Sequence, residues 1–283
     1  MLNLHNEKAD ILVIPKFELR KALQVTTHLA IGAHQDDLEF MASEGILTCF
    51  DAHDKWFTGI TVTDGRGSPR IGPYSNYNDE QMRELRRQEQ RNAAEIGQYA
   101  AQIQLDYKSS EVKGSNRKPA VDDLVQILKE MHPRTIYLHQ PADKHDTHVA
   151  VMMASIEALR SSKDHHIPDR IIGCEGWRGL DWLADDDKVP LDSSKHPALF
   201  QKLTQQFDSQ ISGGKRYDLA VQGRLRANAT FFDSYSPDQG ELIAWGIDLK
   251  PLVLDPSLSM ENFIFGHLNQ LTQDVTERIR KFS

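Results

Sequence analysis

Apolar and polar positions follow two different periods along the first 165 residues of the chain. Short, nearly continuous apolar runs alternate with longer segments in which apolar residues recur every three or four positions. The short runs predict buried strands, and the longer segments predict amphipathic helices. The predicted strands span residues 29–33, 56–62, 103–107 and 135–138, and the predicted helices span 38–50, 81–98, 122–131 and 149–160.

This alternation determines the expected fold class. Strands that alternate with helices are typical of βαβ units, whose strands lie parallel and whose helices cover both faces of the sheet. We therefore predict an α/β fold, a Rossmann-like three-layer sandwich with a mostly parallel sheet.

The pattern becomes less regular after about residue 165. A further strand is predicted at 171–175, and helices are predicted at 197–210 and 261–281. Since no linker of distinct composition separates the two parts, we predict a single domain over residues 1–283. Its Rossmann-like core would span 24–165, and a C-terminal extension, 166–283, would pack on the same sheet.

Composition narrows the class of protein. The chain has 283 residues, a net charge of −8, 39% hydrophobic and 26% charged residues, which is typical of a soluble globular protein. The negative charge disfavours nucleic acid as a partner, because phosphate binding needs a basic surface. No apolar run approaches the roughly 20 residues of a membrane span, and no signal peptide is evident. Cys49 and Cys174 are isolated thiols, so we predict a cytoplasmic, reducing location.

Two polar clusters follow predicted strands. His34, Asp36 and Asp37 come directly after the strand at 29–33, and His145 and His148 follow the strand at 135–138. In a doubly wound sheet, ligands bind at the carboxyl ends of strands where the strand order reverses. The two strand ends can be neighbours there, which would bring the clusters together.

The residue types suggest which role each side chain would have in such a site. His34, Asp37 and His148 make a three-ligand set with an open position, as expected of a catalytic zinc ion, although another divalent metal is also compatible. Asp36 would then serve as general base. His145 would act as an acid or as a partner for a developing oxyanion, in protonated form.

Each cluster also has an ordinary interpretation. Asp37 could simply cap the helix that follows it, and histidines three positions apart near a helix start are often solvated. The conjunction of two clusters, each at the end of a strand and each followed by a helix, favours the metal site.

Several other residues are weaker candidates. Arg66 and Asp64 lie in a glycine-flanked loop after the second strand and could contact substrate, or could only shape the turn. Arg86 and Glu89 could hold the long loop by an ion pair, but a position on a solvated helix is favoured. The segment 212–216 is glycine-rich and basic, and it could cover the pocket. Trp177 and Trp182 could stack on a sugar, but tryptophan is more often a core or interface residue.

At this point the chain resembles the PIG-L/LmbE family of zinc-dependent de-N-acetylases. The family motif Ala-His-Pro-Asp-Asp-x-Glu stands here as residues 33–39, and its His-Pro-Asp-His motif stands as residues 145–148. Residues 61–65, 86–97 and 207–210 are similar to the family segments Leu-Thr-x-Gly, Arg-x-x-Glu with its following alanines, and His-x-Ser-Gln. The similarity spans roughly residues 26–235.

The resemblance implies the same roles as the residue chemistry. It implies that His34, Asp37 and His148 bind zinc. Asp36 would be the base that acts on zinc-bound water, and His145 would assist the tetrahedral intermediate and the leaving group.

Two positions depart from the family pattern. Gln35 replaces a proline, which removes a rigid φ but no ligand. Thr147 replaces an aspartate that would orient the neighbouring ligand imidazole. Asp146 is adjacent, but a shift of one residue usually changes the direction of a side chain. Thr147 is therefore the weak point of the predicted site.

These observations predict a metal-dependent hydrolase of linear amides. It would remove an acyl group, usually acetyl, from an N-acyl amino sugar such as N-acetylglucosamine, or from a small-molecule conjugate of one. One alternative is an amidase that acts on a thiol or sugar-thiol conjugate. Another, prompted by Thr147, is a non-catalytic sugar-binding protein on the same fold. No membrane insertion is expected, and self-association is left open.

Overall fold

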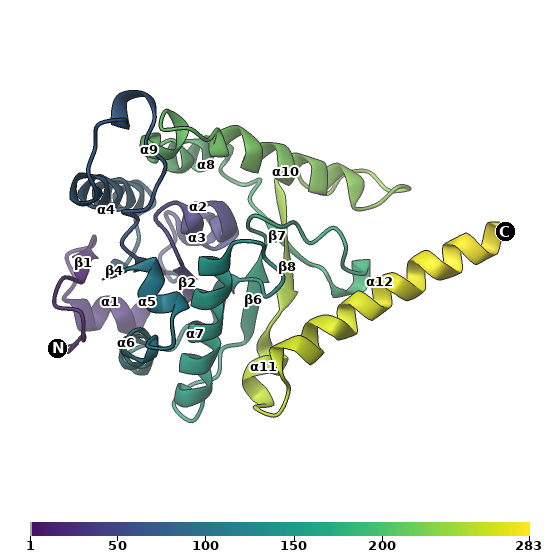
Figure 1. Cartoon of the computed structure of the whole chain (residues 1–283), viewed down its shortest axis with the longest axis horizontal. Coiled ribbons are helices and arrows are strands. Elements are labelled where there is room, and N and C mark those ends of the chain that lie inside the picture. The colour runs from purple at the N-terminus through teal and green to yellow at the C-terminus, as the bar shows by residue number, and fades with distance from the viewer. Residues whose placement is uncertain (1) are drawn as a thin grey trace.

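The computed structural model describes residues 2–283 and contains one eight-stranded sheet with helices on both faces (Figure 1). The strand order is β1-β4-β3-β2-β5-β6-β8-β7. Five central strands run parallel, while β1 lies antiparallel to β4, and β8 lies antiparallel to both β6 and β7. The predicted α/β class and mostly parallel sheet are therefore confirmed. The strands are β1 (Asp10–Val13), β2 (His28–Gly32), β3 (Phe57–Thr63), β4 (Ala101–Tyr107), β5 (Thr135–His139), β6 (Arg170–Cys174), β7 (Val189–Asp192) and β8 (Ile243–Asp248).

Alternate side chains of the central strands enter two separate cores. Leu29 and Ile31 of β2 pack into one core, whereas Ala30 between them packs into the other. This follows from the two-residue period of a strand, which directs successive side chains to opposite faces. The first core is covered by α1 (Leu19–Val25), α5 (Ser109–Lys113), α6 (Lys118–Lys129), α7 (Asp146–Ser162) and α11 (Lys250–Leu254). The second is covered by α2 (Asp37–Met41), α3 (Ser43–Cys49), α4 (Asp79–Ile96), α8 (Pro197–Thr204) and α10 (Tyr217–Phe231).

The sheet reverses its strand order between β2 and β5. These two strands pair in parallel, with His28 opposite Thr135 and Ile31 opposite Leu138. From β2 the chain continues outward through β3 and β4, whereas from β5 it continues in the other direction through β6. The carboxyl ends of β2 and β5 are therefore neighbours, as the sequence predicted.

Several elements differ from the sequence prediction. The helix predicted over 38–50 is divided at Ala42, whose φ of −117° and ψ of 22° are not helical, into α2 and α3. The helix predicted over 197–210 is likewise divided into α8 and α9 (Asp208–Ile211). Strands β1, β7 and β8 and helix α10 were not predicted. Two short 3-10 helices, η1 (Gly72–Tyr74) and η2 (Asp185–Asp187), lie in connecting loops.

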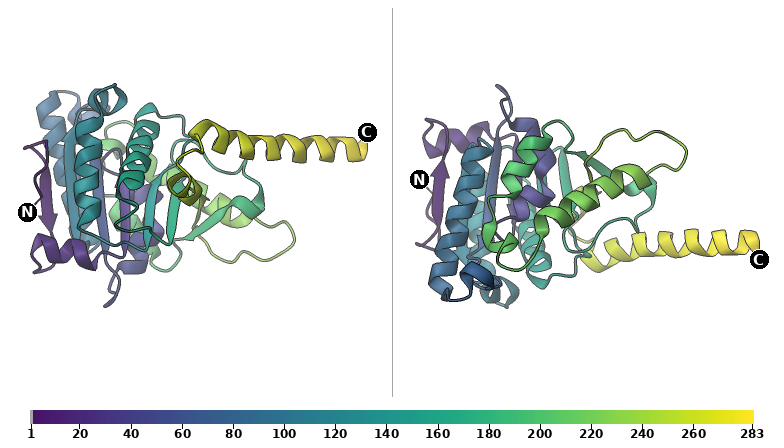
Figure 2. Two further views of the ribbon diagram at one scale, coloured as in Figure 1. Left: turned by 90° about the horizontal axis from the view of Figure 1, so that it is seen from below. Right: turned by 90° about the horizontal axis from the view of Figure 1, so that it is seen from above.

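The C-terminal part extends the sheet and then leaves it. Strands β8 and β7 lie at one edge, next to β6. The final helix, α12 (Met260–Phe282), matches the helix predicted over 261–281 but projects beyond the rest of the molecule (Figure 2). The division of the chain at residue 165 stays a prediction. Within residues 2–283, no helix is long and apolar enough to cross a membrane.

Candidate metal centre

Three predicted ligands converge at the ends of β2 and β5. One metal-competent atom from each of His34, Asp37 and His148 lies within 4.8 Å of the others. Oδ1 of Asp37 is 3.3 Å from Nε2 of His148, and Oδ2 of Asp37 is 3.3 Å from Nδ1 of His34. Asp37 is the first residue of α2, so it does not occupy the N-cap position. The N-cap residue is Asp36, and the side chain of Asp36 makes no capping hydrogen bond.

The charges in this cluster suit a divalent cation. Burial would raise the pKa of Asp37, but the histidines His148 and His139 hold it well below its usual value. Burial also disfavours the charged form of His148, yet Asp37 and Asp143 raise its pKa to about 10. These shifts favour an ionised Asp37 beside a protonated His148, and a cation bound there would take the place of that proton. Two imidazoles and one carboxylate are a donor set that zinc accepts.

A hydrogen bond from an unexpected residue supports the third ligand. Asp143 lies in the loop between β5 and α7, and its Oδ2 is 2.9 Å from Nδ1 of His148. The same carboxylate accepts backbone N–H groups from Lys144 at 2.6 Å, Arg178 at 3.0 Å and Trp177 at 3.2 Å. Asp143 is therefore fixed by three backbone donors, and it fixes the orientation of the imidazole.

This arrangement changes the interpretation of Thr147. The carboxylate that orients His148 comes from five residues before the ligand rather than from the position next to it. Asp146, which the sequence offered as a substitute, is exposed, and Thr147 is buried beside the site. Asp143 thus gives His148 a carboxylate partner, and the effect of Thr147 on activity stays a prediction.

Gly176 makes room for the Asp143–His148 pair. A Cβ atom at this position would lie 2.4 Å from Oδ2 of Asp143 and 3.3 Å from Nδ1 of His148. The first distance is far below van der Waals contact, and the Asp143 side chain is held by its backbone donors. A side chain at position 176 would therefore displace the carboxylate from the imidazole.

The candidate base Asp36 adopts a strained backbone conformation. Its φ of 98° lies in a region that residues with a Cβ rarely adopt. Its Oδ2 is 3.2 Å from Nη2 of Arg86. Burial raises the pKa of Asp36 to about 7, although the charge of Arg86 opposes that rise. A carboxyl group whose pKa lies near neutrality is suited to accepting and releasing a proton at physiological pH.

Arg86 is a buried residue of the site, so the expectation of a solvated position was wrong. Its side chain is 1% exposed and donates to the backbone oxygen of Gln35. It also lies 3.3 Å from Oε2 of Glu89 and 3.3 Å from Oγ of Ser209. Glu89 in turn accepts the backbone N–H and the hydroxyl of Ser209, each at 2.7 Å. This network joins α4 to α9, and through Arg86 it contacts the side chain of the candidate base Asp36.

The segment that carries both clusters matches a known family. Residues 29–159 match the family model described as PIG-L: GlcNAc-PI de-N-acetylase. This segment belongs to the PIG-L family. The predicted resemblance is confirmed, and the family supports an acetyl-removing hydrolase as the general class of protein. No curated protein matches the chain significantly.

Solved structures share the fold of the PIG-L domain. The conserved protein TT1542 from Thermus thermophilus is 15% identical, with a TM-score of 0.64 over 83% of this chain and 99% of that chain. N,N'-diacetylchitobiose deacetylase from Pyrococcus horikoshii is 15% identical, with a TM-score of 0.62 over 81% and 86%. GalB, the 4-carboxy-2-hydroxymuconate hydratase from Pseudomonas putida, is 14% identical, with a TM-score of 0.62 over 79% and 96%. At these identities the likeness shows the fold alone.

Two further histidines of the PIG-L domain face the ligands. His145 has its ring centroid 4.4 Å from that of His148 and 5.0 Å from that of His34. Burial, aided by these two histidines, lowers the pKa of His145 to about 4. The neutral imidazole is therefore favoured over the protonated one that the sequence analysis expected. His145 would act by donating an N–H rather than by carrying a positive charge.

His139 was missed by the sequence analysis. It is the last residue of β5, and its Nε2 accepts the backbone N–H of Ala33 at 3.0 Å, which ties the end of β5 to the end of β2. Its ring stacks on His148 with centroids 3.9 Å apart. Its place at the end of a strand beside the second cluster was the signal that could have revealed it.

A cavity of about 690 Å³ opens over the candidate site of this PIG-L domain. Its polar floor is formed by Asp36, Asp37 and the site histidines, and its wall includes Trp177, Tyr217 and Lys215. Nζ of Lys215 lies 5.4 Å from the centroid of a Trp177 ring. Lys215 is the residue of the segment 212–216 that lines the cavity, so a covering role for the segment stays a prediction. Trp177, 38% exposed, is not a core residue.

Arg66 and Asp64 are paired with each other. The Nε of Arg66 donates to Oδ2 of Asp64, and its backbone N–H donates to Oδ1 at 3.2 Å. The neighbouring residues Gly65, Gly67 and Ser68 line the cavity. The geometry therefore favours a turn-shaping role for this pair, and contact with substrate stays a prediction.

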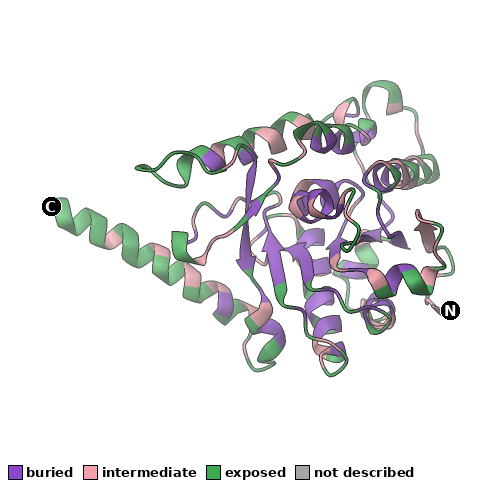
Figure 3. Cartoon of the chain, turned by 180° about the vertical axis from the view of Figure 1, so that it is seen from behind, coloured by how far each residue is buried: buried purple, intermediate pink, exposed green. Residues whose placement is uncertain are grey.

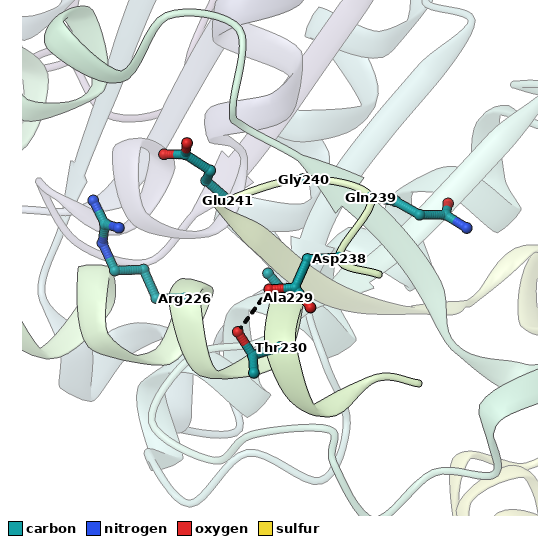
Figure 4. Close-up of a pocket in the computed structure, with 7 residues that line it drawn as sticks. All are labelled: Arg226, Ala229, Thr230, Asp238, Gln239, Gly240 and Glu241. Carbon is teal, nitrogen blue, oxygen red and sulfur yellow. Dashed lines mark hydrogen bonds between the residues drawn. The ribbon is translucent and has the colours of Figure 1, made fainter. Parts of the chain in front are cut away.

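A second hollow lies away from the ligands, between the end of α10 and the segment before β8 (Figure 4). Its volume is about 390 Å³, and Thr230 donates a hydrogen bond to Asp238 across it at 3.0 Å. None of the predicted site residues lines it. It is formed by Arg226, Ala229, Thr230, Asp238, Gln239, Gly240 and Glu241.

Proposed function

We propose that this protein is a metal-dependent hydrolase that removes an acyl group, in the simplest case acetyl, from an N-acyl amino sugar or its conjugate. The observation that carries the proposal is the convergence of His34, Asp37 and His148 beside Asp36, at the floor of a cavity. Family membership of residues 29–159 supports the same reaction class.

His34, Asp37 and His148 would hold the cation, most simply zinc. Such an ion polarises an amide carbonyl and makes water more acidic. Asp36 would accept the proton of the attacking water while Arg86 holds the carboxylate in place. A carbon–oxygen bond forms and the carbon–nitrogen bond breaks, so the products are a carboxylate and a free amine.

His145 would stabilise the developing oxyanion and assist departure of the leaving group. Its neutral ring can donate one N–H to the carbonyl oxygen, where hydrogen bonds are stronger in the transition state than in the substrate. The proton taken by Asp36 can then be passed to the departing amine.

The cavity suits a sugar-sized substrate. Its volume falls in the range of small-molecule sites, roughly 300–1,000 Å³, and Trp177 offers an aromatic face of the kind that stacks on sugar rings. The P. horikoshii protein that shares the fold is a deacetylase of N,N'-diacetylchitobiose. N-acetylglucosamine and its conjugates are therefore the first substrates to test.

Asp36→Asn is the decisive variant. Removing the base while keeping the shape should lower acetate release by about 10²–10⁴-fold, with the metal content unchanged. Released acetate and bound metal would be measured on the purified protein, with a panel of N-acetyl amino sugars and their conjugates. Turnover of the variant within a few-fold of the wild type would refute the role of Asp36.

The same panel separates the alternatives. Preferential cleavage of thiol or sugar-thiol amides would identify the second type of amidase. Because the fold is shared with a hydratase, an unsaturated carboxylate substrate belongs in the panel as well. A protein that binds no divalent ion on reconstitution and releases no acetate would instead be a non-catalytic binding protein.

A further inference from the structure

Helix α12 stands apart from the body of the molecule (Figure 1, Figure 2). Its first turns pack on the body, where Phe263 is buried and Met260 and Ile264 contact the first core. The last side-chain hydrogen bond to the body joins Nδ1 of His267 to Oδ2 of Asp187 at 3.0 Å. Beyond that point most residues of the helix are exposed (Figure 3).

The exposed part carries a narrow apolar stripe. We call it the distal stripe, and its residues are Leu268, Leu271, Val275, Ile279 and Phe282. They are separated by three, four, four and three residues, so at 3.6 residues per turn they fall within about 80° of the helix circumference. Four of the five side chains are exposed, Leu268 at 38%, Val275 at 45%, Ile279 at 62% and Phe282 at 84%, whereas Leu271 is half-buried.

Such a segment needs a partner. A helix of about 15 residues is only marginally stable alone in water, and this part contains threonine and asparagine as well as strong helix formers. A single narrow stripe with a repeat near 3.5 residues is the seam of a two-stranded coiled coil, in which each apolar side chain packs into the facing helix.

We propose that the distal stripe pairs with the distal stripe of a second copy of this chain, in antiparallel orientation. The stripe is symmetric about Val275, since its separations read the same in both directions. Two antiparallel copies would therefore place Val275 on the two-fold axis. Leu268 of each copy would lie opposite Phe282 of the other, and Leu271 opposite Ile279.

The charges select the antiparallel orientation. Arg278 pairs with Asp274 of its own helix, and the last turn beyond it is basic, with Arg280 and Lys281, whereas the distal part begins at His267 beside the acidic turn η2. In the antiparallel pair, the basic end of each helix lies next to the partner's acidic turn. A parallel pair would place the two basic ends side by side and would be disfavoured by repulsion.

The full-length protein provides the test, through its mass in solution at concentrations from about 1 to 100 µM. We expect a concentration-dependent dimer of twice 32.2 kDa. Val275→Arg places two like charges at the axis and should give a monomer over the same range. Gln273→Arg, on the opposite side of the helix, is the matched control and should leave the dimer intact.

Single cysteines report the orientation, because Cys49 and Cys174 are buried. After oxidation, a mixture of the Leu268→Cys and Phe282→Cys variants should form a crosslinked dimer. Leu268→Cys alone should not, since its two thiols would be about 20 Å apart along the helices. A wild-type protein that stays monomeric, a dimer that survives Val275→Arg, or a crosslink in Leu268→Cys alone would each overturn the proposal.

Discussion

The two strand ends that form the candidate site are supported in different ways. At the end of β2, the two ligands support each other directly, since Oδ2 of Asp37 accepts the backbone N–H of His34 at 2.6 Å, while His139 and Arg86 hold the backbone on either side of His34. At the end of β5, His148 is oriented by Asp143, which is itself held by the backbone of Trp177 and Arg178 in the loop after β6. One ligand pair is organised by its own motif, and the other ligand depends on a distant loop.

This difference explains which departures from a motif matter. A ligand supported by its immediate neighbours leaves little freedom for substitution. A ligand supported through space can receive its hydrogen bond from any residue that the fold brings close. The change to Thr147 is of the second kind, since Asp143 provides the carboxylate.

Substitution of Asp37 should give the largest effect, because it breaks the locally supported end. Asp37→Ala removes the one carboxylate among the three ligands and leaves Asp143 as the only carboxylate paired with His148. We expect loss of tightly bound metal and a fall in acetate release of more than about 10³-fold. Metal analysis and an activity assay would check this. Asp146→Ala, at an exposed position, should leave both quantities unchanged, and the prediction would fail if both variants behaved alike.

Substitution of Asp143 tests the support of His148 at the end of β5, which involves the loop after β6. Asp143→Asn should weaken metal binding by about 10–100-fold, as measured by competition with a chelator, because an amide oxygen is a weaker acceptor than a carboxylate for the N–H of His148. Adding Thr147→Asp should restore part of the affinity by returning the carboxylate to the motif position. Equal affinity in the wild type and Asp143→Asn would show that the distant support is not needed.

The pH dependence of kcat/KM should show the smallest of these effects, and the effect should change gradually with pH. Since burial raises the pKa of Asp36 to about 7, its basic form is lost as the pH falls through that value. A bound cation would shift this limb to lower pH without changing its sign. We expect kcat/KM at saturating metal to fall about tenfold per pH unit on the acid side. A flat profile down to about pH 5 would speak against a raised pKa.

The fold was largely predictable because its central strands are buried on both faces. Such strands are continuous apolar runs, and the βαβ alternation then determines the class. The edge strands were missed for physical reasons. Strand β7 contains Pro190, which suits only an edge, and β8 contains Gly246, whose lack of a side chain leaves space for Ile172.

The candidate site was predictable only where its chemistry follows a strand directly. His34, Asp37 and His148 stand out by type and place. Arg86 does not, because α4 is strongly charged and its buried face contains charged residues, Arg83 and Glu89 among them, that resemble those on its exposed face. Asp143 lies in a polar loop, and only the folded loop after β6 shows why its carboxylate is fixed.

Gly176 has a consequence for how this site can change over evolutionary time. Asp143 occupies the space that a side chain at position 176 would need. Substitutions at these two positions therefore affect each other, although the positions are 33 apart in the sequence. Neither can be altered first without disturbing His148. The orientation of the third ligand in this chain therefore depends on a glycine that lies outside both ligand motifs, residues 33–39 and 145–148.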